Sequence, residues 1–239
     1  PPLQLNELNE LDPLRPYTST SPISNWGTKE NFNHSTMHYW GVWHGREPFE
    51  NYEDNVGRFM VEYGFQSFPE MNTLKKVMAD SSLNLNSLAM KKRQKSYIGN
   101  GLIEKHVKQY YDEPKSFEEF VELSQKTQAK GMDMAIQAHR KAMPHCMGTM
   151  FWQLNDCWPG PSWSVIDYYG NEKRAYNVVK ESYKPVIAVR DSNMISILST
   201  KKTNYLGVIS LVIKLKNGKE KQFSFPFVDV EPMSIRKID

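Results

Sequence analysis

The sequence predicts an α/β fold, namely half of a (β/α)8 TIM barrel followed by part of an all-β sandwich. Over residues 1–184, strand-like apolar runs alternate with helical patterns, which is typical of parallel strands connected by helices. After Lys184-Pro185, five short β runs follow one another without a helical pattern. We therefore expect two domains, an α/β domain over 1–184 and a β-sandwich domain over 185–239.

The α/β domain contains four strand candidates, at residues 16–22, 37–43, 58–64 and 148–154. The helix candidates lie at 3–11, 71–78, 83–95, 116–142 and 171–183. The longest begins with Ser116-Phe-Glu-Glu119, a capping box in which two side chains satisfy backbone amides of the first turn. Four strands are half of a barrel that typically takes about 250 residues. Because a half-barrel leaves two sheet edges open, we expect it to pair with missing sequence of the same polypeptide.

The β-sandwich domain is expected to have strands at residues 186–189, 194–199, 206–215, 222–230 and 233–238. Lys216-Asn217-Gly218-Lys219 is a strong signal for a tight hairpin turn. An immunoglobulin-like sandwich takes about 100 residues, so the remaining residues are enough for only part of one.

The composition is ordinary for a globular protein, and the net charge of +3 is too small to imply a polyanionic partner. We interpret the basic run at residues 91–95 as a solvated helix face, so we expect no nucleic-acid partner. Apolar stretches are too short to span a bilayer, so we expect no membrane partner. The two cysteines, Cys146 and Cys157, neither fix nor exclude an oxidising compartment.

Three histidines, His34, His38 and His44, have the spacing of a zinc protease site. Ser35 follows the first histidine, where such a site needs a glutamate as general base. The intervening residues are also β-like, whereas the first two zinc ligands should lie on a helix. We therefore attribute the spacing to chance and expect no metal.

Glu62 is a single acid at the end of an apolar run, which predicts a strand buried on both faces. An unpaired buried carboxylate costs several kcal/mol or more, so the residue needs a reason to be there. At the carboxyl end of a barrel strand it would project into an active site. Two interpretations remain open, a catalytic group and a structural carboxylate bound by its neighbours. Arg58 lies too far along the strand to be its direct partner.

A second dense region, residues 151–163, combines tryptophans, amides and prolines after a strand. Trp rings bind the apolar faces of sugars, and Asn155 and Asp156 can bind hydroxyls. The alternative is a rigid aromatic loop that closes the end of the barrel.

Three segments together resemble the β-mannosidases of glycoside hydrolase family 2: 37–40 (Met-His-Tyr-Trp), 62–69 (Glu-Tyr-Gly-Phe-Gln-Ser-Phe-Pro) and 151–163. The resemblance covers about residues 10–185 and implies barrel strands 5–8, with an immunoglobulin-like domain after them. It implies that Glu62 is the nucleophile of a retaining exo-hydrolase of terminal β-mannosides or manno-oligosaccharides, with no cofactor. It places Trp152, Trp40, Tyr39 and His44 in the substrate-binding site, and suggests a periplasmic or secreted location.

A retaining glycosidase needs a second carboxyl group as acid/base. The resemblance implies a glutamate after an asparagine, but Asn6-Glu7 and Asn9-Glu10 lie in a polar, helix-like stretch. We therefore expect the acid/base upstream of Pro1, in the N-terminal part of the polypeptide. Two alternatives stay open. One is a related specificity, such as exo-β-glucosaminidase or β-galactosidase, and the other is a non-catalytic fragment.

Overall fold

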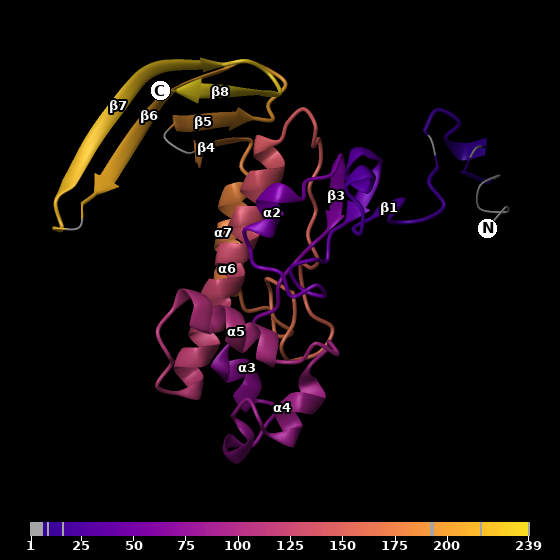
Figure 1. The fold of residues 1–239 in the computed structure, drawn as a ribbon, viewed down its shortest axis with the longest axis vertical. Coiled ribbons are helices and arrows are strands. Elements are labelled where there is room, and N and C mark those ends of the chain that lie inside the picture. Colours follow the sequence, from indigo (N-terminus) through magenta and orange to yellow (C-terminus); the bar gives the residue numbers. More distant parts are fainter. Residues whose placement is uncertain (1–6, 9, 16, 192–193, 216, 239) are drawn as a thin grey trace.

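Helix α6 (Phe117–Lys141) runs through the centre of the molecule, with α7 (Arg174–Ser182) packed along it (Figure 1). The computed structural model describes residues 7–8, 10–15, 17–191, 194–215 and 217–238. Helices α3 (Met71–Lys75), α4 (Leu88–Arg93) and α5 (Gly101–Tyr110) lie at one end, and a β-rich part lies at the other. The fold is therefore mixed α/β, as the sequence predicts.

A small parallel sheet lies beside the helices, in the order β1 (Ser24–Asn25), β2 (Thr36–His38), β3 (Phe59–Glu62). An extended segment at residues 147–152 continues it on the far side of β3. There Met60 N donates to Gly148 O at 2.9 Å, and Met150 N donates to Met60 O at 2.7 Å. Four parallel segments thus lie side by side, and His38 is in register with Glu62.

The strands are shorter than the sequence suggests. Residues 17–22 form no strand, and β1 begins only after Pro22, which lacks the N–H that a sheet ladder needs. The strand expected over 37–43 ends at His38, because the chain turns and Trp40 O accepts a hydrogen bond from His44 N at 2.7 Å. In β3, Met60 is fully buried but Phe59 is 37% exposed, so this strand is not buried on both faces.

The predicted long helix forms as α6, with Ser116 as its N-cap. Ser116 Oγ accepts from Glu119 N at 3.1 Å, whereas Glu119 Oε2 accepts from Lys115 N at 2.7 Å, one residue earlier than a capping box requires. The helices expected over 71–78, 83–95 and 171–183 form in part, as α3, α4 and α7. Of the helix expected over 3–11, residues 7, 8, 10 and 11 are helical and the others lie outside the described residues.

Several short elements were not expected from the sequence. They are η1 (Lys29–Asn33), α2 (Asn51–Asp54), α5 and η2 (Asp80–Ser82). Helix α5 starts at Asn100-Gly101 without a side-chain cap, so it lacks the usual start signal.

The main hydrophobic core lies between the parallel sheet and the helices. Its largest fully buried side chains are Trp43, Tyr39, Tyr52, Tyr63, Phe49, Phe65, Phe68, Met37, Met60, Leu74 and Met90. These aromatic rings come mostly from the segments that follow β2 and β3, so the same core that stabilises the fold also fixes the ends of those strands.

The last part of the chain contains the five expected strands. Three form an antiparallel sheet in the order β4 (Val186–Asp191), β5 (Met194–Ser199), β8 (Ser234–Ile238). The other two, β6 (Tyr205–Lys214) and β7 (Glu220–Val230), form a long hairpin that projects from this sheet (Figure 1). Gly218 has a φ of +80° in the turn, where glycine adopts the left-handed conformation without strain. A second, small cluster of buried side chains, Ile197, Val228 and Val230, joins the two sheets.

Candidate active site

Glu62 is the last residue of β3, and its side chain is 26% exposed. Two side chains contact the same carboxylate oxygen. Trp40 Nε1 donates to Glu62 Oε2 at 3.1 Å, and His38 Nδ1 lies 3.2 Å from that atom. The carboxylate is therefore neither fully buried in the core nor free in solvent, but held at the end of a strand and partly exposed.

The parallel pairing of β2 and β3 explains this convergence, because parallel strands bring their carboxyl ends to the same edge of a sheet. Tyr39 N donates to Glu62 O at 2.9 Å, which fixes the residues after β2 beside Glu62. Ser21 Oγ lies 3.1 Å from the other imidazole nitrogen of His38. Since a carboxylate accepts only, the tautomer that fits has the proton on Nδ1, with Nε2 accepting from Ser21.

Trp40 and His44 lie together next to the carboxylate. Their rings pack edge to face with centroids 5.4 Å apart, and His44 stacks on the exposed ring of Tyr97. His44 Nδ1 is 3.2 Å from Tyr97 Oη, and burial lowers the pKa of His44 below its ordinary value. Trp40 thus contacts Glu62 directly, whereas His44 reaches it only through Trp40.

Tyr39 is the exception among the predicted substrate-binding residues. Its side chain is 1% exposed, and its phenol donates to Glu47 Oε2 at 2.5 Å. Burial, together with the carboxylate of Glu47, raises the pKa of this phenol far above its ordinary value. Tyr39 thus points into the core and is not among the side chains that contact Glu62 in the described residues, so its place in the substrate-binding site stays a prediction.

Trp152 lies on the strand-like segment next to β3. Its backbone N donates to Tyr63 O at 2.9 Å, and its side chain is 42% exposed. A Cβ on Gly64 would lie only 2.2 Å from Trp152 O, so glycine is what allows the two chains to approach this closely. The Trp152-Gln153 peptide bond is cis. The structure therefore brings Trp152 to the residues that immediately follow Glu62.

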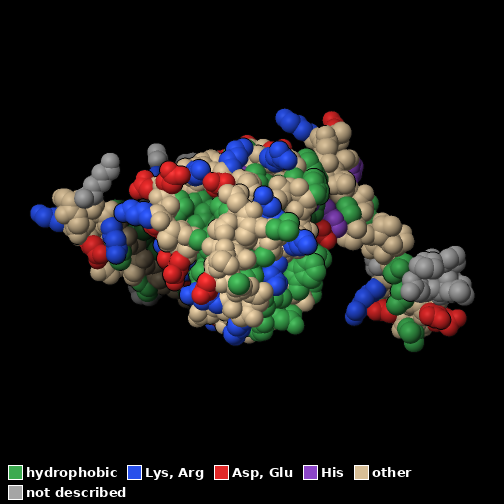
Figure 2. Space-filling view, turned by 90° about the horizontal axis from the view of Figure 1, so that it is seen from below, with side chains coloured by type: hydrophobic (Ala, Val, Ile, Leu, Met, Phe, Trp, Pro, Cys, Tyr) green, Lys and Arg blue, Asp and Glu red, His purple; other side chains and the backbone are tan. Residues whose placement is uncertain are grey.

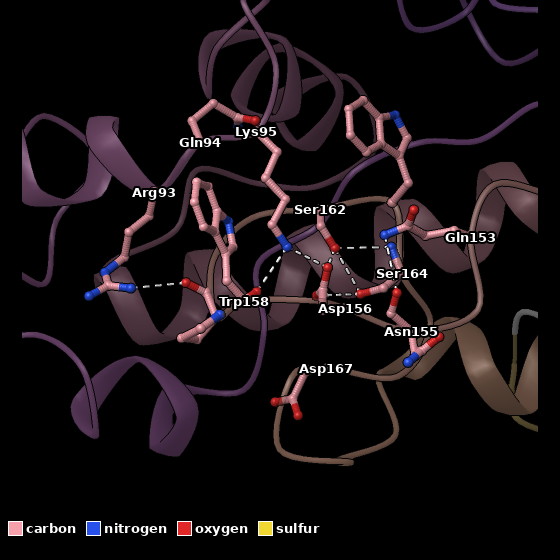
Figure 3. A network of polar contacts seen from close by, with 12 residues as sticks. Arg93, Gln94, Lys95, Gln153, Asn155, Asp156, Trp158, Ser162, Ser164 and Asp167 are labelled. Atoms are coloured by element: carbon pink, nitrogen blue, oxygen red, sulfur yellow. Dashed lines mark hydrogen bonds and ion pairs between the residues drawn. The ribbon is translucent and has the colours of Figure 1, made fainter.

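The loop after Trp152 is fixed by a polar network (Figure 3). Asp156 pairs with Lys95 and accepts hydrogen bonds from Ser162 Oγ and Ser164 Oγ. Lys91 and Lys92 are exposed, as expected of a solvated face, but Lys95 departs from that interpretation because its side chain is only 12% exposed. Asp156, named from the sequence as able to bind sugar hydroxyls, is buried, and its side-chain contacts in the described residues are to Lys95, Ser162 and Ser164.

His38 is the contact to Glu62 that the sequence analysis missed. It was considered only as a zinc ligand, whereas alternation along a strand could have found it. β2 ends at His38, but burial still alternates just beyond it: Tyr39 is buried, whereas His38 and Trp40 are partly exposed and both contact Glu62.

No second carboxylate from the described part of the chain forms a contact with Glu62. Glu7 and Glu10 are exposed on a helical segment of the N-terminal arm, which extends away from the rest of the molecule (Figure 1).

In the described ranges, no group of three or more His, Cys, Asp or Glu residues could hold a metal ion. Nor does any described helix combine the length and apolar character that crossing a membrane requires. On the face shown in Figure 2, acidic and basic side chains are interspersed.

No protein-family model matches the chain, but individual relatives do. It is 32% identical over 199 residues to β-mannosidase B of Thermothelomyces thermophilus, and this alignment covers 74% of the chain and 22% of the relative. It is 30% identical over 218 residues to β-mannosidase B of Aspergillus niger, and this alignment covers 85% of the chain and 26% of the relative. The crystal structure of a β-D-mannosidase from Dictyoglomus thermophilum superimposes with a TM-score of 0.84 at 26% identity, over 97% of this chain and 29% of that protein.

The chain is a relative of the family 2 β-mannosidases. A further fold likeness, to an exo-chitosanase from Amycolatopsis orientalis, has a TM-score of 0.66 at 19% identity over 80% of this chain and 25% of that protein. This β-mannosidase-like chain spans only about a quarter of the length of the relatives it matches.

Proposed function

We propose that this chain carries the nucleophile of a retaining, exo-acting β-mannosidase, and that the nucleophile is Glu62. The observation that supports this most is the pair of donors on one carboxylate oxygen at the end of a parallel strand. The contacts from Trp40 and His38 hold the carboxylate in one orientation, which is what a positioned nucleophile needs. The relation to β-mannosidases supplies the substrate, a terminal β-mannoside of an oligosaccharide or glycan.

Because both donors contact Oε2, Oε1 is the oxygen that attacks. In the first step, a bond forms between Oε1 and the anomeric carbon while the bond from that carbon to the leaving oxygen breaks. A second carboxyl group protonates the leaving oxygen. In the second step that group takes a proton from water, which attacks the anomeric carbon and releases Glu62. The second carboxyl belongs to a preceding part of the polypeptide.

The same proposal assigns the four parallel segments to the second half of a (β/α)8 barrel, strands 5–8, within residues 1–184. Residues 185–239 form the start of an immunoglobulin-like sandwich. The order of parallel strands with helices between them supports the first assignment, and the two antiparallel sheets support the second. The missing N-terminal part of the polypeptide would close the barrel.

Trp152 and Trp40 would form the wall of the site that holds the terminal mannose. Both are partly exposed and lie on either side of the chain that carries Glu62. Their rings offer flat apolar faces, which match the C–H faces of a pyranose. His44 would lie further out, at the edge of this wall.

The test is turnover of an aryl β-mannoside by the complete polypeptide. Glu62→Ala is expected to abolish turnover, because no other group replaces the nucleophile. Glu47→Gln is a matched control, since Glu47 is also a half-buried, hydrogen-bonded carboxylate but contacts Tyr39 in the core. Near-normal turnover by Glu62→Ala would refute the role. Faster turnover of an aryl β-glucosaminide or β-galactoside would instead assign a different specificity to the same machinery.

The isolated 239-residue chain is expected to be inactive, because the groups that contact Glu62 in the described residues are a histidine and a tryptophan. Activity of this chain above that of its Glu62→Gln variant would show that the second carboxyl group lies within it.

A further inference from the structure

Lys95 forms a buried ion pair with Asp156, which lies in the loop that follows Trp152 (Figure 3). The Asp156 side chain is 1% exposed, and that of its partner Lys95 is 12% exposed. Lys95 Nζ also donates to Trp158 O at 2.9 Å, and the neighbouring Arg93 donates to Pro159 O at 3.1 Å. The segment after α4 is thus attached to the loop that follows Trp152.

The carboxylate of Asp156 holds both neighbours of Trp163. Ser162 Oγ and Ser164 Oγ donate to Asp156 Oδ2 at 2.8 and 2.6 Å. From α6, Gln128 Nε2 donates to Trp163 O at 3.0 Å. The backbone on both sides of Trp163 is therefore fixed by buried polar groups.

Trp163 in turn packs against the residue that binds Glu62. Its ring lies edge to face on Trp40, with centroids 6.0 Å apart, and on Trp43 at 5.7 Å. Trp43 Nε1 donates to Ser96 Oγ at 3.0 Å, and Ser96 directly follows Lys95. Of the two rings next to Trp163, Trp43 is therefore held by the segment that follows Lys95, and Trp40 donates to Glu62.

A buried ion pair is seldom more stabilising than well-packed apolar side chains of similar volume, so stability alone does not explain this one. A buried carboxylate with partners on both oxygens, as Asp156 has, instead specifies a single geometry for the groups bound to it. Here the geometry that it specifies is the position of Trp163 and, through ring contact, the position of the Trp40 indole.

We propose that Lys95 and Asp156 are positioning residues that fix the Trp40 indole N–H against Glu62. The inference rests on the proposed function only in calling Glu62 a nucleophile. The contact from Asp156 through Ser162 and Ser164 to Trp163 and Trp40 exists whatever Glu62 does.

The direct test is the indole N–H signal of Trp40 in a ¹⁵N-labelled chain, assigned with Trp40→Phe. Glu62→Ala gives the reference position for loss of the acceptor, because it leaves no side-chain oxygen at this position. Asp156→Asn is expected to move the signal toward that reference, because the indole no longer holds its place. Asp167→Asn is the matched control, since Asp167 is equally buried but bonds to Thr73 and Asn171, away from the tryptophans.

Milder variants keep the test decisive if Asp156→Asn does not fold. The double variant Ser162→Ala/Ser164→Ala leaves the ion pair intact and removes only the link to Trp163, so it should move the Trp40 signal in the same direction. Lys95→Met should do so too, whereas Lys95→Arg, which keeps charge and donors, should largely restore it. An unmoved signal in the serine double variant, or an equal movement in Asp167→Asn, would overturn the proposal.

Turnover by the complete polypeptide gives a second readout. A displaced Trp40 affects both the attacking carboxylate and the wall of the sugar site, so kcat/KM should fall roughly 10- to 100-fold, and kcat should fall with it. A purely structural brace would lower the melting temperature and leave kcat of the folded enzyme unchanged. Loss of turnover in Glu62→Ala tests the nucleophile separately, so failure of one proposal is distinguishable from failure of the other.

Discussion

The contact between His38 and Glu62 allows an estimate of how much rate is lost when the His38 donor is removed. His38 Nδ1 lies 3.2 Å from Glu62 Oε2, and a hydrogen bond to a charged group contributes about 1.5–3 kcal/mol. A loss of about 1.4 kcal/mol corresponds to a tenfold lower rate. Because the Glu62 side chain is 26% exposed, water can partly replace the lost donor, so the lower end of this range applies.

His38→Phe is therefore expected to lower kcat/KM of the complete polypeptide on an aryl β-mannoside by about tenfold. Ser21→Ala removes only the contact to the far nitrogen of His38, so its effect should be smaller, about two- to fivefold. Steady-state kinetics of the two variants beside wild type checks both values. Wild-type kcat/KM in His38→Phe, or a larger loss in Ser21→Ala than in His38→Phe, would refute the role assigned to this contact.

Three further predictions concern stability, each measured by urea unfolding. Burial lowers the pKa of His139 from 6.5 to about 3. Between these two pH values the unfolded chain therefore binds more protons than the folded chain. The free energy of unfolding should fall as the pH drops below 6.5, by up to about 1.4 kcal/mol per pH unit. His139→Gln should flatten this slope, and an identical slope would contradict the assignment. Gly64→Ala places a Cβ 2.2 Å from Trp152 O and should cost about 1–3 kcal/mol. Gly101→Ala is the control, because its Cβ would meet no atom within 4 Å and its φ, like that of Gly64, is not positive. Ser116→Ala removes the cap on Glu119 N and should cost about 1 kcal/mol; no change would mean that the cap is dispensable.

The sequence predicted best the elements that local pattern determines. The β runs of the last part of the chain are all strands, because side chains alternate between the two faces along them, as the burial of β6 shows. Helix α6 was found from its cap and its apolar stripe. Short elements with neither signal, such as β1 and α2, could not be found, because their backbone is fixed by neighbouring segments rather than by their own residues.

In the candidate site, the sequence identified Glu62 and Trp40 but not how they are held. The resemblance implies a place in the site for Tyr39 as well as Trp40, yet in the structure the Tyr39 side chain is buried in the core while Trp40 contacts Glu62. Lys95 was taken for a solvated residue because its partner, Asp156, lies 61 positions further along the chain. Long-range pairing of this kind leaves no local pattern, so only the fold could reveal it.

The most direct test of the central claim is to identify the residue that becomes covalently attached to the sugar. The complete polypeptide is incubated with a 2-fluoro β-mannosyl fluoride, which slows hydrolysis of the intermediate, and the labelled peptide is identified by mass spectrometry. The account predicts a single mannosyl label on Glu62, and none in Glu62→Gln. A label on another carboxylate, or turnover without any covalent intermediate, would contradict it.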